Sequence, residues 1–250
     1  MTDRFSLKGR IALVTGASRG LGLAIAEALA EHGARVVLNG RDPETLRSAA
    51  AKITNAEFAA FDVCDAKAGP TAIADIVNRH GKLDILINNA GIQHRRPLTE
   101  WEDGDFERIL AANLTSCFRL AREAARVMVP RGHGRIINTG SIVAILARQT
   151  IHGYVASKAG LHGLTRSMAA EIGRYGVTVN AIAPGFFATE LNQALLADKE
   201  FTAWVERRTP SGRWANPEEL GGAVIFLASD AASYVNGHVL AVDGGLSVSL

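Results

Sequence analysis

The chain has 250 residues, of which 48% are hydrophobic and 21% charged, and 27 basic and 25 acidic residues give a formal net charge of +2. This length suits a single open α/β domain of ordinary globular composition. A charge this small, without a basic run, argues against nucleic acid as a partner. The chain has no apolar run near the ~18 residues that cross a bilayer and no secretory segment at its start, so we expect a cytoplasmic protein without membrane contact.

The two cysteines, Cys64 and Cys117, lie far apart in the chain and form no CxxC pattern. We expect both to be buried, reduced thiols, which suits a reducing compartment. The sequence shows no cluster of residues with metal-ligand spacing, so we predict no metal site.

Short apolar runs alternate along the chain with segments of helical period. The predicted strands cover residues 10–16, 34–40, 56–63, 83–91, 134–141, 177–185 and 238–245. The predicted helices cover residues 20–32, 43–53, 105–129, 155–175 and 217–229. This alternation predicts an α/β fold, a doubly wound parallel sheet (Rossmann fold) with helices on both faces. We find no linker or repeat, and we predict one dinucleotide-binding and catalytic domain over residues 1–250.

Residues 186–216 interrupt the alternation after the sixth strand. A long insertion near the carboxyl ends of strands is often a substrate lid, and we predict a small helical lid here. A surface helical hairpin without a role in binding is the alternative.

The first strand ends in a glycine-rich turn, TGASRGLG, and a helix follows at once. Gly16 permits the tight turn, Gly20 lets the backbone approach a pyrophosphate, and Gly22 lets the helix pack on the strand. The free N–H groups of the helix would face the phosphates. The spacing differs from the common GxGxxG pattern, so a glycine turn that serves only packing is the alternative.

The end of the second strand bears on the choice between NAD and NADP. An acidic residue about 20 positions after the glycines would bind the ribose hydroxyls, but that position is Gly40, followed by Arg41. A guanidinium pairs well with a phosphate, and Arg19 in the turn could reach the same group. We therefore predict NADP (NADPH), although Asp42 would favour NAD if the turn shifted by one residue.

Two further strand ends face the same edge. Asp62 and Val63 would lie near the adenine, with a helix-capping role for Asp62 as the alternative. Asn89, Ala90 and Gly91 close the fourth strand with small residues, against which a cofactor could lie.

A candidate catalytic group begins with Tyr154 and Lys158, four residues apart and hence on one helical face. A nearby cation lowers the pKa of a phenol from its usual value of about 10, which makes the pair a plausible acid/base unit. Ser141, at the end of the fifth strand, could hydrogen-bond a substrate carbonyl. Asn113, inside a helix, could hold a water in a proton relay to Lys158 or could join two helices.

Taken together, these motifs are similar to those of the short-chain dehydrogenase/reductase family. The resemblance runs from about residue 8 to 247 and includes TGASRGLG, NNAG at 88–91 and Pro184-Gly185 with the four residues of the catalytic group. It implies that Tyr154 is the general acid in reduction, that Lys158 lowers the pKa of Tyr154 and binds the nicotinamide ribose, that Ser141 orients the carbonyl, and that Asn113 supports the relay. It also implies a homotetramer, with helices 105–129 and 155–175 between subunits.

The cofactor-binding set predicted in this way is Gly16, Ser18, Arg19, Gly20, Leu21, Gly22, Arg41, Asp62, Val63, Asn89, Ala90, Gly91, Tyr154, Lys158, Pro184, Gly185, Phe187 and Thr189.

The substrate is indicated by the segment GIQHRRP after the fourth strand. Arg95 and Arg96 there suggest an anionic substrate, and Arg95, with Ser141 and Tyr154, forms the predicted substrate-binding set. A solvated loop or a subunit contact is the alternative, and the role of Arg96 stays open. The stretches GIQHRRPL and PGFFATE are similar to those of family members that interconvert D-gluconate and 5-dehydro-D-gluconate. Reduction of a 3-oxoacyl carrier-protein thioester, oxidation of another sugar or polyol, and a non-catalytic dinucleotide sensor are the alternatives.

Overall fold

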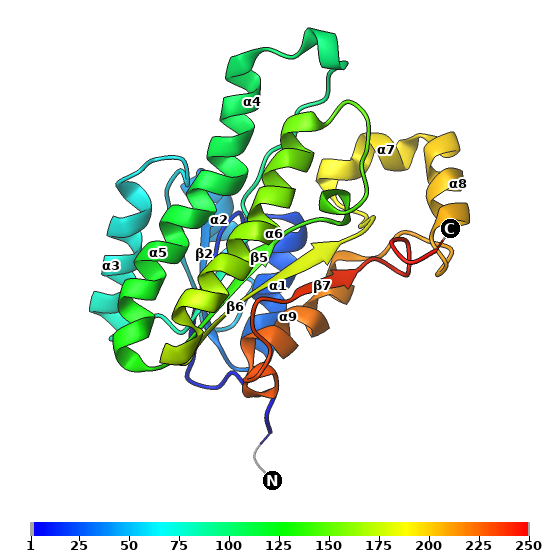
Figure 1. The fold of residues 1–250 in the computed structure, drawn as a ribbon. Helices are drawn as coiled ribbons and strands as arrows, with labels where there is room; N and C mark the ends of the chain where they lie inside the picture. The colour runs from blue at the N-terminus through cyan, green and yellow to red at the C-terminus, as the bar shows by residue number, and fades with distance from the viewer. Residues whose placement is uncertain (1–2, 250) are drawn as a thin grey trace.

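The computed structural model describes residues 3–249, and within them a seven-stranded parallel sheet lies between two layers of helices (Figure 1). The strands are β1 (Ile11–Val14), β2 (Arg35–Gly40), β3 (Ala56–Ala60), β4 (Ile85–Asn88), β5 (Gly134–Thr139), β6 (Val177–Pro184) and β7 (Val239–Val242). Their order in the sheet is β3-β2-β1-β4-β5-β6-β7. The predicted strands and the doubly wound fold are confirmed. The chain reverses its direction of winding between β1 and β4, where such sheets bind ligands beyond the strand ends.

The α-helices fill the connections between the strands. They are α1 (Gly20–Glu31), α2 (Pro43–Ala50), α3 (Ala68–His80), α4 (Asp103–Leu110), α5 (Ser116–Met128), α6 (His152–Ile172), α7 (Gln193–Ala197), α8 (Lys199–Arg208) and α9 (Gly221–Ala228). The sequence analysis missed α3. Its first turn contains Gly69 and Pro70, which usually mark a loop, whereas Ile73 and Ile76 are buried.

The segment predicted as one helix over 105–129 is two α-helices joined by a π-helical turn, Ala111–Thr115. Short π-helical insertions occur often at functional sites. Here the turn carries Asn113, which is fully buried.

The sheet separates two apolar cores. On one face, side chains of β1 and β2 pack with α1, α2 and α9, for example Ile25, Leu46 and Val224. On the other face, Leu120 of α5 and Ala169 of α6 belong to the second core, together with residues of α3. Figure 1 shows α3, α5 and α6 in front of the sheet and α1 and α9 behind it. Strands covered on both sides need continuous apolar runs, as the sequence has.

The two cysteines have different environments. Cys117 is buried, as predicted, but the expectation was wrong for Cys64, which is exposed. Cys64 lies on the loop after β3. Because β3 is at the edge of the sheet, this loop is in contact with solvent.

Within the described part of the chain, no helix is both long and apolar enough to cross a membrane. Residues 3–249 likewise hold no group of three or more His, Cys, Asp or Glu side chains placed to bind a metal ion.

Candidate active site

The glycine turn lies between β1 and α1 at the carboxyl edge of the sheet. Gly16 and Gly20 have φ of +63° and +58°, which only glycine adopts without strain. A methyl group on Gly22 would lie 2.2 Å from the Gly16 carbonyl oxygen, so the helix packs directly on the turn. The side chain of the N-cap residue, Arg19, accepts no hydrogen bond from the first turn of α1. The uncapped N–H groups and the helix dipole thus suit a phosphate.

Asn89, the residue directly after β4, holds this turn in place. Its Nδ2 donates to the carbonyl oxygens of Thr15, at 3.0 Å, and Gly16, at 3.2 Å. The Thr15 hydroxyl accepts hydrogen bonds from the backbone N–H groups of Asn89 and Ala90. The NNAG segment therefore fixes the glycine turn, in addition to its predicted role of offering small residues against which a cofactor could lie.

The end of β2 lies beside the glycine turn, because a methyl group on Gly40 would be 3.6 Å from Ser18 Cβ. Arg41 is exposed there. Asp42 is the N-cap of α2, where its carboxylate accepts a hydrogen bond from the Thr45 N–H at 2.7 Å, and this bond lowers the pKa of Asp42. Asp42 is thus engaged by the helix, and the cationic side chain of Arg41 remains beside the turn.

Asp62 and Val63 follow β3. The Asp62 carboxylate accepts from the Cys64 N–H at 2.8 Å, while Asp65 accepts from the N–H groups that open α3. Asp62 therefore does not cap α3, whose N-cap residue is Lys67; the carboxylate that meets the start of this helix is that of Asp65. Val63 packs partly against the second core.

The segment after β6 passes over the glycine turn. Thr189 lies there, 3.8 Å from the position of a methyl group on Gly20. Gly185 packs on Asp243, whose Cα is 2.7 Å from the position of a Gly185 methyl group, so no larger residue fits. The side chain of Phe187 is buried in the first core, so only its backbone could face a dinucleotide, whereas Leu21 is partly buried against that core.

Tyr154 and Lys158 lie one turn apart in α6. The Lys158 ammonium is buried, donates to the Thr139 carbonyl oxygen at 2.6 Å, and lies 5.5 Å from the centroid of the Tyr154 ring. This bond ties α6 to the end of β5, two residues before Ser141. The 3-10 turn that Ser141 caps packs against α6, and the Ser141 hydroxyl oxygen accepts from the Val143 N–H at 3.3 Å. The hydroxyl proton of Ser141 is thus available to a substrate oxygen.

Asn113 joins three segments. Its Oδ1 accepts from the Ile92 N–H at 2.8 Å, and its Nδ2 donates to the Ile92 carbonyl and to the Ser157 hydroxyl. It makes no direct bond to Lys158. A methyl group on Gly91 would lie 3.2 Å from Asn113 Oδ1 and 3.8 Å from Lys158 Nζ, so both groups face the same small space.

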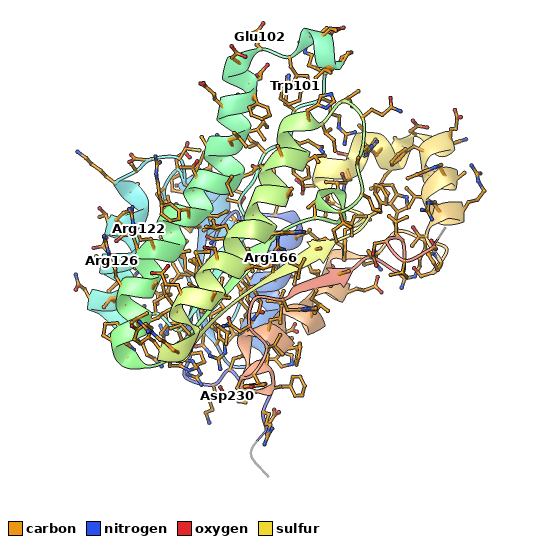
Figure 2. The ribbon with its side chains drawn as sticks, in the orientation of Figure 1. Trp101, Glu102, Arg122, Arg126, Arg166 and Asp230 are labelled. Atoms are coloured by element: carbon orange, nitrogen blue, oxygen red, sulfur yellow. The ribbon has the colours of Figure 1, made fainter. Side chains whose placement is uncertain are left out.

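The predicted substrate rim is the loop that follows β4. Arg95 is exposed to solvent. The pKa of its guanidinium is nevertheless lowered, because partial loss of hydration outweighs the opposite effect of the Tyr154 phenol. Arg96 lies on the surface and pairs with Glu100 at 3.6 Å. Trp101 donates from its indole to the Arg96 carbonyl and lies at the opposite end of the molecule from Asp230 (Figure 2).

Sequence reasoning missed Arg148, which lies between Ser141 and Tyr154 along the chain. Burial lowers the pKa of Arg148, and the positive charge of Arg95 lowers it further. Its guanidinium lies 4.5 Å from the centroid of the Phe201 ring on α8, within the predicted lid. Its place before α6 was visible in the sequence, but the fold of the loop that brings it to Arg95 was not.

Comparisons with known proteins place this site in a family. The family model described as "Enoyl-(Acyl carrier protein) reductase" matches residues 16–247. Gluconate 5-dehydrogenase of Gluconobacter oxydans is 50% identical over 252 residues, which cover 99% of this chain and 98% of the relative. The 3-oxoacyl-[acyl-carrier-protein] reductase FabG of Vibrio cholerae is 42% identical over 242 residues, 96% of this chain and 98% of the relative. The crystal structure of a gluconate 5-dehydrogenase from Burkholderia cenocepacia in complex with NADP and tartrate superposes with a TM-score of 0.96, at 46% identity and 99% coverage of both chains.

Proposed function

Since the chain belongs to the short-chain dehydrogenase/reductase family and is an oxidoreductase, we propose that it interconverts D-gluconate and 5-dehydro-D-gluconate with NADP(H). The observation that carries the proposal is the grouping of Tyr154, Lys158 and Ser141 at the carboxyl edge of the sheet, with the cationic Arg95 on the loop after β4. A sugar acid needs a cationic partner for its carboxylate within reach of the reacting carbon. The 50% identical relative bears the same activity in its name.

The residues at the carboxyl edge fit a dinucleotide phosphate. Two glycines with positive φ, an uncapped helix start and Arg41 beside the turn offer N–H groups and positive charge. We infer NADP as the cofactor, in agreement with the relative crystallised with NADP. When bound, the nicotinamide supplies or accepts the hydride.

In the reduction, the roles of the protein are to orient the ketone and to move a proton. The Ser141 hydroxyl donates to the carbonyl oxygen and fixes its position. The Tyr154 hydroxyl donates its proton to that oxygen as the alcohol forms. The Lys158 ammonium, held by the Thr139 carbonyl, favours the negative charge that remains on the Tyr154 oxygen. Asn113 shares the space at Gly91 with Lys158, where a bridging water would carry a proton onward.

We further infer that residues 186–216 form the substrate lid of a single domain covering residues 1–250. The 3-10 turn Glu190–Asn192 begins the helical part, and α7 and α8 follow. Asp198 caps α8 by accepting from the Glu200 and Phe201 N–H groups, both at 3.0 Å. Phe186, Phe201 and Trp214 pack edge to face, which ties α8 back to the end of β6. Contact of Phe201 with Arg148 favours a lid over a surface hairpin without a role.

We also infer a cytoplasmic homotetramer. An apolar groove between the π-helical turn and α6 is lined by Leu114, Leu164 and the exposed Phe118. Such a face suits burial by a second copy of the chain. Light scattering on the purified protein tests the assembly, and a monomer at micromolar concentration would contradict it.

The proposed reaction is tested by NADPH oxidation with 5-dehydro-D-gluconate and, separately, with an acetoacetyl thioester. We expect turnover of the sugar acid, and activity on the thioester alone would instead favour a 3-oxoacyl reductase. The Michaelis constant should be lower for NADPH than for NADH, and the reverse order would overturn the cofactor assignment.

The variant Tyr154→Phe tests the proton-donor role. Removing the phenol hydroxyl should reduce kcat by about 100-fold or more, because positioned acid/base groups contribute factors of 10² to 10⁴. NADPH binding, measured by fluorescence titration, should stay within about 3-fold, because backbone and Arg41 contacts hold the phosphates. Full activity of the variant would remove Tyr154 from the mechanism.

A further inference from the structure

Arg95 and Arg148 reach one region of the rim from different segments. Arg95 follows β4, whereas Arg148 follows the 3-10 turn Ile142–Ala144 that Ser141 caps. Burial lowers the pKa of both guanidinium groups. The positive charge of Arg95 lowers the pKa of Arg148 further, whereas the Tyr154 phenol partly offsets the lowering at Arg95. The two loops that carry these arginines adjoin each other, because the Arg96 N–H donates a backbone hydrogen bond to the Thr150 carbonyl oxygen.

The loop that carries Arg148 has a strained backbone. Thr150 has φ of +69°, a left-handed conformation that is rare for a β-branched residue. The Thr150 carbonyl oxygen accepts a hydrogen bond from the Arg96 N–H at 2.9 Å, next to Arg95. Strain of this kind persists where the surroundings hold it, often at a ligand clamp. This backbone bond joins the two loops that bear the arginines.

The lid lies against the other side of Arg148. The Phe201 ring is 4.5 Å from the guanidinium carbon and stacks on Trp204, with ring centroids 5.4 Å apart. A flat guanidinium on an aromatic face is held in orientation while its N–H edge stays free to bind an anion. The predicted lid thus contacts Arg148 directly.

Neither arginine has an acidic partner within the part of the chain that the structure describes. Residues 3–249 contain no carboxylate within 4.0 Å of either guanidinium, and the side chain of Arg95 donates only to the Gln93 amide oxygen, at 3.0 Å. Two neighbouring like charges repel, and a carboxylate placed between them would relieve the repulsion. A guanidinium pair also matches the two oxygens of one carboxylate.

We propose that Arg148, together with Arg95, binds the carboxylate of the substrate and makes the enzyme prefer a sugar acid to a neutral polyol. The inference rests on the proposed function, since it assumes a substrate with a carboxylate at the end remote from the reacting carbon. It adds a specificity residue that the sequence did not reveal, and it gives α8 a role in placing that residue.

The test compares D-gluconate with D-glucitol, which has the same carbon chain and a CH₂OH group in place of the carboxylate. In Arg148→Gln, kcat/KM for gluconate should fall about 10- to 100-fold, as expected for loss of charge-assisted hydrogen bonds. The value for glucitol should change by less than about 3-fold, so that the preference for the acid shrinks. Arg148→Lys keeps the positive charge but loses the planar guanidinium that binds a carboxylate through two hydrogen bonds. Its kcat/KM for gluconate should lie between those of the wild type and Arg148→Gln.

Arg96→Gln is the matched control, because Arg96 is the adjacent arginine and pairs with Glu100 on the surface. It should change neither value by more than about 3-fold. Equal losses on gluconate and glucitol in Arg148→Gln would overturn the proposal, since they would indicate a general structural role. NADPH binding and circular dichroism establish that the variant is folded.

A binding measurement separates this inference from the proposed function. Calorimetry with tartrate on the NADP-saturated enzyme needs no turnover. If the wild type does not oxidise gluconate, the proposed function fails, yet about 10-fold weaker tartrate binding in Arg148→Gln still supports a carboxylate site. Unchanged tartrate affinity in the variant, or no tartrate binding by the wild type and no preference for gluconate over glucitol, would overturn the role of Arg148.

Discussion

Gly22 illustrates how individual residues determine the geometry of the cofactor edge. The sequence predicted its role in packing, and the structure shows the reason, since a Cβ there would lie 2.2 Å from the Gly16 carbonyl oxygen and 2.5 Å from Asn89 Nδ2. Both neighbours belong to the turn that would bind the phosphates, so the turn cannot yield without losing its own hydrogen bonds.

We therefore expect Gly22→Ala to lower the free energy of unfolding by about 1–3 kcal/mol, the usual cost of overpacking, and to weaken NADPH binding at least 10-fold. Chemical denaturation and fluorescence titration measure the two effects. Gly222→Ala, in α9 with open space around the added methyl, is the control and should be neutral or slightly stabilising. A Gly22→Ala protein with normal stability and NADPH affinity would contradict the packing argument.

At the same scale, the sequence predicted side chains that act through their own chemistry and missed those that act through loop geometry. Tyr154 and Lys158 share a face because helical periodicity fixes it. The loop of Arg148 joins that of Arg95 through the carbonyl of Thr150, which has a left-handed conformation that no rule predicts for a threonine. Likewise, the carboxylate that accepts from the first N–H of α3 is that of Asp65 and not that of Asp62, three residues earlier in the same loop.

At the scale of elements, the regular patterns of apolar residues predicted the strands well, whereas breaks within an element left no signal in the sequence. The strands lie within the predicted ranges because burial on both faces requires continuous apolar runs. The π-helical turn at Ala111–Thr115 has no period of its own within a long helical pattern, so sequence reasoning passed over it. That turn nevertheless carries Asn113 to the loop at Ile92.

An ion pair links the glycine turn to the lid, and it yields a prediction about the cofactor. Arg19 Nη1 lies 3.5 Å from Glu190 Oε2, and both side chains are largely exposed. If Arg19 pairs with an NADP phosphate, Glu190 competes for it. Glu190→Gln should then lower the Michaelis constant for NADPH about 2- to 5-fold, in line with the small energy of exposed pairs, and leave that for NADH unchanged.

Steady-state kinetics with both cofactors measures this effect. Glu100→Gln, which removes a similar exposed pair with Arg96 away from the turn, is the control and should leave both constants unchanged. A higher Michaelis constant for NADPH in Glu190→Gln would show that the pair holds the lid in a binding conformation and that Arg19 does not meet the phosphate.

At the scale of the whole molecule, the two ends of the sheet carry different kinds of polar groups. The carboxyl end holds the candidate site. At the amino end, Arg135 is buried and pairs with Asp230 at 3.3 Å, while Arg10 lies 2.6 Å from the His133 ring nitrogen Nε2. The sequence indicated the first group through its motifs. The second was invisible, because its members come from three separate segments with no spacing to connect them.

Two histidines predict how stability depends on pH: His133, half-buried at this amino end, and His162, buried on α6. Burial lowers the pKa of His133 to about 4, helped by Arg10 and Arg135, and burial with the charge of Lys158 lowers that of His162 to about 4. In the unfolded chain a histidine titrates near 6.5. Between these values the unfolded state binds more protons, so the free energy of unfolding falls as the pH drops from about 6.5 towards 4 and is fully retained above 6.5.

We expect each of the two histidines to cost about 1 kcal/mol at pH 5 after allowance for solvent screening, which together lowers Tm by about 4–8 °C relative to pH 7.5. Calorimetry at constant ionic strength measures this shift, and a lower limit of pH 5 avoids most carboxylate titration. His133→Gln removes one of the two groups, so the fall in Tm should shrink by about half. A Tm that does not fall on acidification, or an unchanged fall in His133→Gln, would show that the ring near Arg10 accepts a proton in the folded protein and that the charge of Asp230 outweighs its burial.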